Sequence, residues 1–217
     1  MYNEQDKEIF PFASRLKDEG RGIPFILLIH YSKAVRQRVL ESPHPGVDFV
    51  FSWHGNADLI LAIVKLLEDA ANAENDVFEV GVKGILLVED SIRYYSNYLP
   101  ELYKIVLTQS REFLTESLND DQKKYRKRSR PKIFLATCLE EAIAYFEKYR
   151  RNLLGVISDV GMVFHKGDDP KTEKLDAGID LVRIIREYDP LMPVLLQSSQ
   201  GSLSKSAAER GVGFLKK

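Results

Sequence analysis

The hydrophobic positions along this chain alternate between two patterns. Short runs that are almost continuously apolar are typical of strands covered on both faces of a sheet. These runs lie at 25–30, 47–52, 84–89, 132–137, 154–158, 193–198 and 212–215. Longer segments in which apolar residues return with the helical period predict amphipathic helices. These segments lie at 57–73, 92–107, 139–149 and 178–188. Strands and helices in alternation predict an α/β fold, with a parallel sheet wrapped by helices.

The order helix, strand, helix, strand occurs twice in the chain. The first copy spans 13–53, with its second helix at 32–41, and the other copy spans 180–217. Self-similarity of this kind marks structural units. We therefore predict an N-terminal α/β half-unit at 1–80. A fuller unit follows at 81–217, and it lacks a C-terminal helix of its own.

The helix at 57–73 stands between these two units in the sequence. Its apolar stripe suits it to cover a sheet, since the strands of parallel sheets are usually buried on both faces. Two arrangements remain open at this stage. The helix covers the sheet of the second unit near 84–89, or it covers only strands 25–30 and 47–52 of its own unit.

Composition narrows the class of protein. Apolar residues make up 44% of the 217 residues, which is enough for a sizeable core. The net charge of −1 gives no general attraction to nucleic acid or to an anionic membrane. The basic run 123–130 stands beside acids at 119–121, and we interpret it as a solvated helix end. No apolar run reaches the roughly 20 residues that span a bilayer. We expect a cytoplasmic protein that binds neither nucleic acid nor membrane.

Charged and polar side chains follow the strands of the second unit. Glu89 and Asp90 end the first of these strands, and Asp159 ends the third. Ser198 ends the fourth strand and Lys217 ends the fifth. In a parallel sheet these strand ends share one edge, which is where ligands of open α/β sheets bind. The sequence therefore predicts a polar site at this edge.

Three neighbouring carboxylates repel one another unless a cation joins them. Mg²⁺ takes oxygen ligands and keeps several waters, so it suits this set of side chains. We expect Asp90, Asp159 and the backbone carbonyl of Gly161 to supply ligands, with Glu89 direct or through water. Asp159 is then placed as a nucleophile toward phosphorus. The metal and Lys217 would neutralise the charge of the resulting acyl phosphate.

Four short motifs at these strand ends resemble the receiver domain of two-component response regulators, the CheY-like family. The motifs are VED at 88–90, ISD at 157–159, LQSS at 196–199 and FLKK at 214–217. The resemblance implies a doubly wound, flavodoxin-like parallel sheet with five strands in the order 2-1-3-4-5. It also implies Mg²⁺-dependent phosphorylation of Asp159 by a histidine kinase or a phosphotransfer histidine protein. Ser198 and Lys217 would sense the phosphoryl group.

The chain departs from this family in several places. An inserted polar loop at 163–177 overhangs the expected site. The family's last helix has no counterpart, so we expect a fused effector domain beyond Lys217, and a homodimer is a further candidate partner. In the first unit, Ile29 and Ser52 or Trp53 stand at the positions of Ser198 and Lys217. We therefore interpret residues 1–80 as a partial, degenerate receiver-like unit that cannot be phosphorylated.

Two other functions fit parts of the pattern. One is a pseudo-receiver scaffold, in which the site is vestigial and the protein only binds partners. The other is a phosphatase of the haloacid dehalogenase type, which also uses an Asp nucleophile and Mg²⁺. That class needs an Asp two residues after the nucleophile, where this chain has Gly161, and its motifs run in the reverse order. We expect a signalling domain with at most self-phosphorylation and autodephosphorylation.

Overall fold

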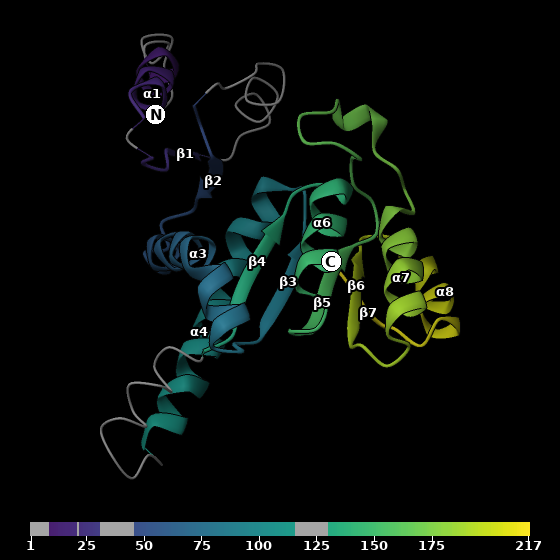
Figure 1. The fold of residues 1–217 in the computed structure, drawn as a ribbon. Coiled ribbons are helices and arrows are strands. Elements are labelled where there is room, and N and C mark those ends of the chain that lie inside the picture. The colour runs from purple at the N-terminus through teal and green to yellow at the C-terminus, as the bar shows by residue number, and fades with distance from the viewer. Residues whose placement is uncertain (1–8, 21, 31–45, 116–129) are drawn as a thin grey trace.

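Figure 1 shows the computed structural model of the chain. The structure describes residues 9–20, 22–30, 46–115 and 130–217. The predicted helix at 32–41 and nearly all of the basic run 123–130 lie outside the described residues. Within the described parts, no helix is both long enough and apolar enough to cross a membrane.

The second unit is built on a five-stranded sheet whose strands are all parallel. Its strands are β3 (Gly84–Val88), β4 (Lys132–Ala136), β5 (Leu153–Asp159), β6 (Val194–Ser198) and β7 (Gly213–Lys216). They are arranged in the order β4-β3-β5-β6-β7. Numbered from the first strand of this unit, the order is 2-1-3-4-5. The predicted α/β fold, of the flavodoxin and CheY-like type, is therefore confirmed.

One face of this sheet is covered by three helices. They are α6 (Leu139–Tyr149), α7 (Ala177–Tyr188) and α8 (Ser204–Glu209). Leu86 and Val88 of β3 point into this layer and pack with Phe146, Leu181 and Leu196 in one buried cluster. Their neighbours in β3 belong to the opposite face, because successive side chains of a strand alternate. Both faces of β3 are therefore buried, which explains its uninterrupted apolar sequence.

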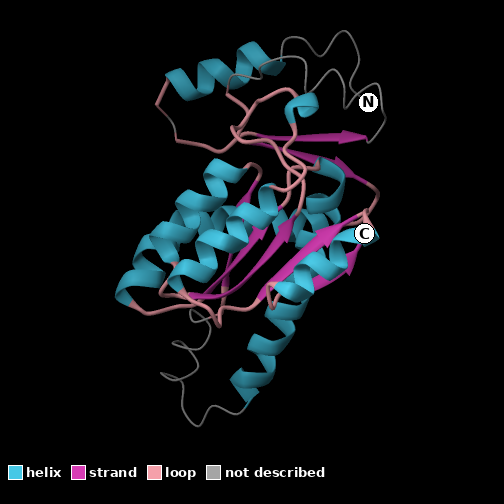
Figure 2. Cartoon of the chain, turned by 90° about the vertical axis from the view of Figure 1, so that its right-hand side faces the viewer, coloured by secondary structure: helices cyan, strands magenta, loops and turns pink. Residues whose placement is uncertain are grey.

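The opposite face is covered by α4 (Ile92–Thr115) and α3 (Asp58–Glu74), and Figure 2 shows helices on both sides of the sheet. Leu87 of β3 and Leu66 of α3 belong to the same buried cluster. The contacts of α3 are mainly with α4 and β4. So α3 does cover part of the sheet of the second unit, at its β4 edge. Over β5, β6 and β7 this face carries an open groove that includes Ile157 and Leu195.

The N-terminal unit contains α1 (Ile9–Asp18) and two parallel strands, β1 (Ile26–His30) and β2 (Phe49–Trp53). Its strand β2 is attached to the beginning of α4. The Tyr95 hydroxyl of α4 donates a hydrogen bond to the Val50 carbonyl. The Ser52 amide donates to the hydroxyl of Ser96, with 2.9 Å between the two atoms. These bonds connect the half-unit to the helix that starts beside Glu89 and Asp90.

A buried group of charges fixes α3 to β4. Asp69 of α3 is fully buried and forms an ion pair with Arg130, with 2.6 Å between Oδ1 and Nη2. Lys132 of β4 lies 2.5 Å from Asp76 and 3.5 Å from Asp69. Asp69 Oδ2 also accepts hydrogen bonds from the Tyr103 hydroxyl and from a backbone amide of β4. We call these residues the Asp69 cluster.

Candidate functional site

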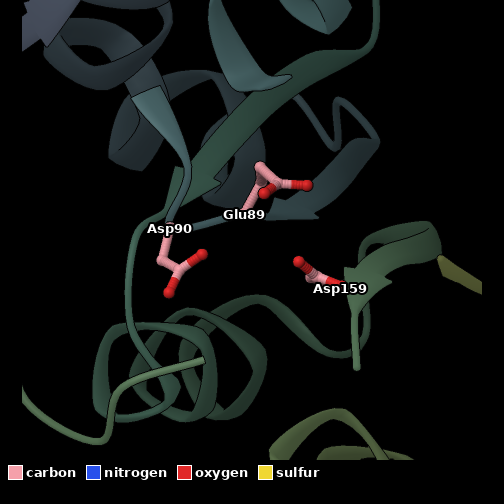
Figure 3. Close-up of side chains that lie close together, drawn as sticks. All are labelled: Glu89, Asp90 and Asp159. Atoms are coloured by element: carbon pink, nitrogen blue, oxygen red, sulfur yellow. The ribbon is translucent and has the colours of Figure 1, made fainter. Parts of the chain in front are cut away.

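Strand register brings the predicted acids together at the carboxyl edge of the sheet. Val88 at the end of β3 pairs with Ser158 of β5, so Glu89 and Asp159 follow at the same level. The Glu89 amide donates to the Ala136 carbonyl at 3.0 Å, which continues the ladder one residue past β3. Figure 3 shows the three carboxylates of Glu89, Asp90 and Asp159 turned toward a common space. One oxygen from each lies within 4.8 Å of the others.

Lys217 supplies the positive charge of this edge. Its Nζ lies 2.6 Å from Glu89 Oε2 and 2.5 Å from Asp159 Oδ2. The Lys217 amide donates to the Ser198 carbonyl at 3.0 Å, which extends β7 along β6 and positions the side chain. The ammonium also lies over the Tyr94 ring, 4.2 Å from its centre. Lys217 was predicted to lie here, and the structure places its side chain against the carboxylate of Asp159.

The electrostatics of the site favour uptake of positive charge. Burial, followed by the charge of Asp159, raises the pKa of Glu89 to about 8, although the Lys217 ammonium opposes the shift. Burial, followed by the charges of Asp159 and Glu173, raises the pKa of Asp90 to about 6. One ammonium therefore does not balance the three acids, and a divalent cation would lower the free energy of their ionised forms.

Lys217 itself is stabilised in its charged form. Burial acts to lower the pKa of its ammonium, but the charge of Glu89 and the hydrogen bond to Asp159 outweigh this effect and raise the pKa. Lys217 is therefore an ammonium at neutral pH. In this form it pairs with both Glu89 and Asp159.

The donor set fits the predicted metal. Glu89, Asp90 and Asp159 offer only oxygen atoms, and hard cations such as Mg²⁺ prefer these ligands to nitrogen or sulfur. Asp90 makes no ion pair within the described residues, because Lys217 is directed at the other two acids. Gly161, predicted to supply a carbonyl, lies two residues beyond Asp159 on the same edge. These groups would hold the cation if it binds.

Ser198 ends β6 and is largely buried, with 7% of its surface exposed. Its hydroxyl oxygen accepts a hydrogen bond from the Gln200 amide at 3.1 Å. Its strand neighbour Gln197 pairs in register with Asp159. The hydroxyl therefore belongs to the residue immediately beyond the level of Asp159, and its role as a phosphate sensor stays a prediction.

Two residues near the site were missed by sequence reasoning. Tyr94 lies in the first turn of α4, and its ring stacks on Tyr98 as well as contacting Lys217. Glu173 comes from the inserted loop, and its carboxylate approaches Gly161. The position of Tyr94, a few residues after the acid pair at the start of a helix, was a usable signal. Glu173 had none, because a loop sequence does not show where the loop folds back.

Comparisons with known proteins add little at the level of sequence. No protein-family model matches the chain. No curated protein matches it either. A solved receiver domain of a response regulator from Clostridium thermocellum is 21% identical and has a TM-score of 0.36, with 63% of this chain and 82% of that chain covered. The CheX-CheY-BeF3-Mg²⁺ complex from Borrelia burgdorferi contains a chain that is 22% identical, with a TM-score of 0.37 and coverage of 64% and 82%.

The assignment of the receiver fold rests on the strand order and on the register that unites the strand ends. The three acids and Lys217, which lie far apart in the sequence, meet at the one edge that the fold predicts.

Proposed function

We propose that this chain is a phosphoacceptor receiver module, in which Asp159 accepts a phosphoryl group in a Mg²⁺-dependent reaction. The observation that carries the proposal is the meeting of Glu89, Asp90 and Asp159 at one sheet edge, with the Lys217 ammonium on the acceptor carboxylate. Of the two acids that form ion pairs with Lys217, Asp159 is the more exposed, with 15% of its side chain accessible against 1% for Glu89. A donor can therefore reach Asp159 more readily than Glu89.

The reaction is an in-line displacement at phosphorus. An oxygen of Asp159 forms a bond to phosphorus, and the bond from phosphorus to the leaving group of the donor breaks, with the electron pair departing on that group. Bound Mg²⁺ would neutralise charge on the transferred oxygens. The Val160 amide donates to Asp159 Oδ1 at 2.7 Å and so fixes the orientation of the carboxylate before attack.

Lys217 and Ser198 then respond to the product. The Lys217 ammonium, already against Asp159, pairs with the new phosphoryl oxygens, which carry more negative charge than the carboxylate. The Ser198 hydroxyl donates to a phosphoryl oxygen while its own oxygen keeps the Gln200 amide. Movement of β6 and β7 toward the phosphate would change the surface that a partner protein recognises. The natural donors would be a histidine kinase or a phosphotransfer histidine protein, and a partner protein or a second copy of this chain would bind the changed surface.

The test uses a small phosphodonor. The whole chain is incubated with acetyl phosphate, with and without Mg²⁺, and its intact mass is measured. We expect one added phosphoryl group that depends on Mg²⁺ and that hydroxylamine removes, because an acyl phosphate is labile to this nucleophile. Asp159→Asn should abolish the adduct, while Asp18→Asn, which removes an exposed acid at the end of α1 in the N-terminal unit, should retain it.

The alternatives predict different results. A pseudo-receiver scaffold forms no adduct under any of these conditions. A phosphatase of the haloacid dehalogenase type releases phosphate steadily from many phosphate esters and accumulates little adduct. Gly161, in place of the acid that such a phosphatase requires, favours the receiver over the phosphatase.

A further inference from the structure

The inserted loop extends beyond the sheet, and its end returns to the site. It runs from β5 to α7 (Figure 1) and is fixed near its end by an isolated antiparallel bridge between Met162 and Lys174. The Met162 amide donates to the Lys174 carbonyl at 3.2 Å, and the Lys174 amide donates back to the Met162 carbonyl at 3.0 Å. The Lys174 side chain is in turn paired with Asp180 of α7. The residue just before this bridge is Glu173, so its backbone is fixed close to the end of β5.

The side chain of Glu173 occupies space that Gly161 leaves free. A Cβ atom built on Gly161 would overlap the Oε1 atom of Glu173. Gly161 is not among the glycines with positive φ, so its backbone conformation does not require glycine. Position 161 requires glycine because any side chain there would overlap the carboxylate of Glu173. The loop and the glycine therefore fit one another, with the carboxylate of Glu173 beside the backbone of Gly161.

Glu173 is an exposed residue whose carboxylate lies beside Gly161. Its carboxylate makes no hydrogen bond or ion pair within the described residues, and the nearby Lys174 is directed at Asp180 and Asp176. It lies close enough to Asp90 for the two charges to repel. A carboxylate held next to other acids without a cation raises the free energy of the protein. A cation among these acids would reverse the sign of that interaction.

We propose that Glu173, delivered by the inserted loop, is a further carboxylate beside the cation site and strengthens its binding of Mg²⁺ through a metal-bound water. This inference rests on the function proposed above, since it assumes that Glu89, Asp90 and Asp159 bind the ion. It gives the inserted loop a specific role, because the loop brings a charge that the strands of the sheet cannot supply. A site with an added negative charge binds a divalent cation more tightly.

The test is the Mg²⁺ affinity of the whole chain, measured by isothermal titration calorimetry. Glu173→Gln removes one charge and keeps the size of the side chain, and we expect it to weaken Mg²⁺ binding roughly threefold to tenfold, as expected for one partly solvated charge near a divalent ion. Asp176→Asn is the matched control, because it removes the same charge from the end of the same loop, where it faces Lys174. We expect the affinity of this control to stay within about twofold of the wild-type value.

Gly161→Ala provides an independent test that leaves Glu173 intact. Its new methyl group would displace the Glu173 carboxylate, so the variant should weaken Mg²⁺ binding about as much as Glu173→Gln. The double variant should then lose little more than either single variant, because both remove the same interaction. An unchanged midpoint of thermal unfolding in the absence of metal would show that each variant is folded.

Failure of this inference differs from failure of the proposed function. If the wild type binds Mg²⁺, and Glu173→Gln and Gly161→Ala bind it with the same affinity, Glu173 does not belong to the site and the proposed function stands. Additive losses in the double variant would likewise show that the two residues act separately. If the wild type shows no saturable Mg²⁺ binding, both proposals are overturned.

Discussion

Two groups of charges within the described residues, the Asp69 cluster and the acids at the sheet edge, differ in how their charges are balanced. In the Asp69 cluster, Asp69 and Asp76 face Arg130 and Lys132, so every acid has a cation. At the carboxyl edge of the sheet, Glu89, Asp90 and Asp159 share a single ammonium from Lys217. The Asp69 cluster is buried, whereas at the sheet edge Glu89 is buried and Asp90 and Asp159 are half-buried. Both groups join segments that are distant in the sequence. The first is complete within the protein, whereas the second has an excess of negative charge.

This difference separates a structural role from a binding role. Removing any member of a balanced group destabilises the folded protein, because the remaining partner is left buried and unpaired. Removing one of the like charges of an unbalanced group stabilises the metal-free folded protein, and such a group readily takes up a cation or a proton. The same chemical change, Asp to Asn, should therefore lower the free energy of unfolding in the Asp69 cluster and raise that of the metal-free protein at the sheet edge.

The largest effect is expected for Asp69→Asn. It leaves Arg130 and Lys132 with one carboxylate fewer in a buried setting, and the loss of one partner of a buried pair costs about 3 to 5 kcal/mol. We expect the free energy of unfolding in urea to fall by this amount. Lys148→Ala breaks an exposed ion pair with Glu74 and serves as a control, with a much smaller change in the free energy of unfolding. A loss of similar size in both variants would remove the distinction between buried and exposed pairs.

The second prediction concerns Asp90→Asn at the sheet edge. Removal of a direct ligand should weaken Mg²⁺ binding by about a hundredfold or more, since even the loss of residues that only support a ligand costs 10- to 100-fold. Calorimetric titration of the variant measures this change. In the absence of metal at about pH 8, the same variant should be more stable than the wild type, by about 1 to 2 kcal/mol, because it removes a repelling buried charge. A less stable metal-free variant would contradict the comparison between the two groups.

A smaller change in the stability of the metal-free protein is expected when the pH is varied. The pKa of Asp90 rises from 3.8 to about 6 in the folded protein, and that of Glu89 rises from 4.5 to about 8. Between about pH 4 and about pH 8 the folded state therefore binds more protons than the unfolded state, so the stability of the metal-free protein falls as pH rises. The advantage of Asp90→Asn in urea unfolding should therefore shrink between about pH 8 and about pH 5. Mg²⁺ binding should follow the opposite trend and weaken toward acid pH, because protons compete for the same oxygens. An advantage that is the same at both pH values would contradict this assignment.

Much of the fold could be predicted, for physical reasons visible in particular residues. The strands of the main sheet are covered on both faces, so residues such as Leu86 and Leu87 are both apolar and the run is easily recognised. The site acids lie at strand ends, where topology alone brings them to one edge. Contacts formed by helix faces and loops were harder to predict. Asp69 lies on the buried face of α3 among apolar residues, and only its partner from another segment, Arg130, explains it. Glu173 required knowledge of where the inserted loop returns.

The central claim is that Asp159 carries the phosphoryl group in the presence of Mg²⁺. The most direct measurement treats the chain with acetyl phosphate, reduces the acyl phosphate with borohydride, and maps the modified residue by mass spectrometry of its peptides. Reduction converts a phosphorylated aspartate into homoserine, which identifies the position without ambiguity. The account predicts homoserine at position 159 alone, and only when Mg²⁺ is present. Modification at Asp90 or Ser198 in place of Asp159, or no modification in the wild type, would contradict it.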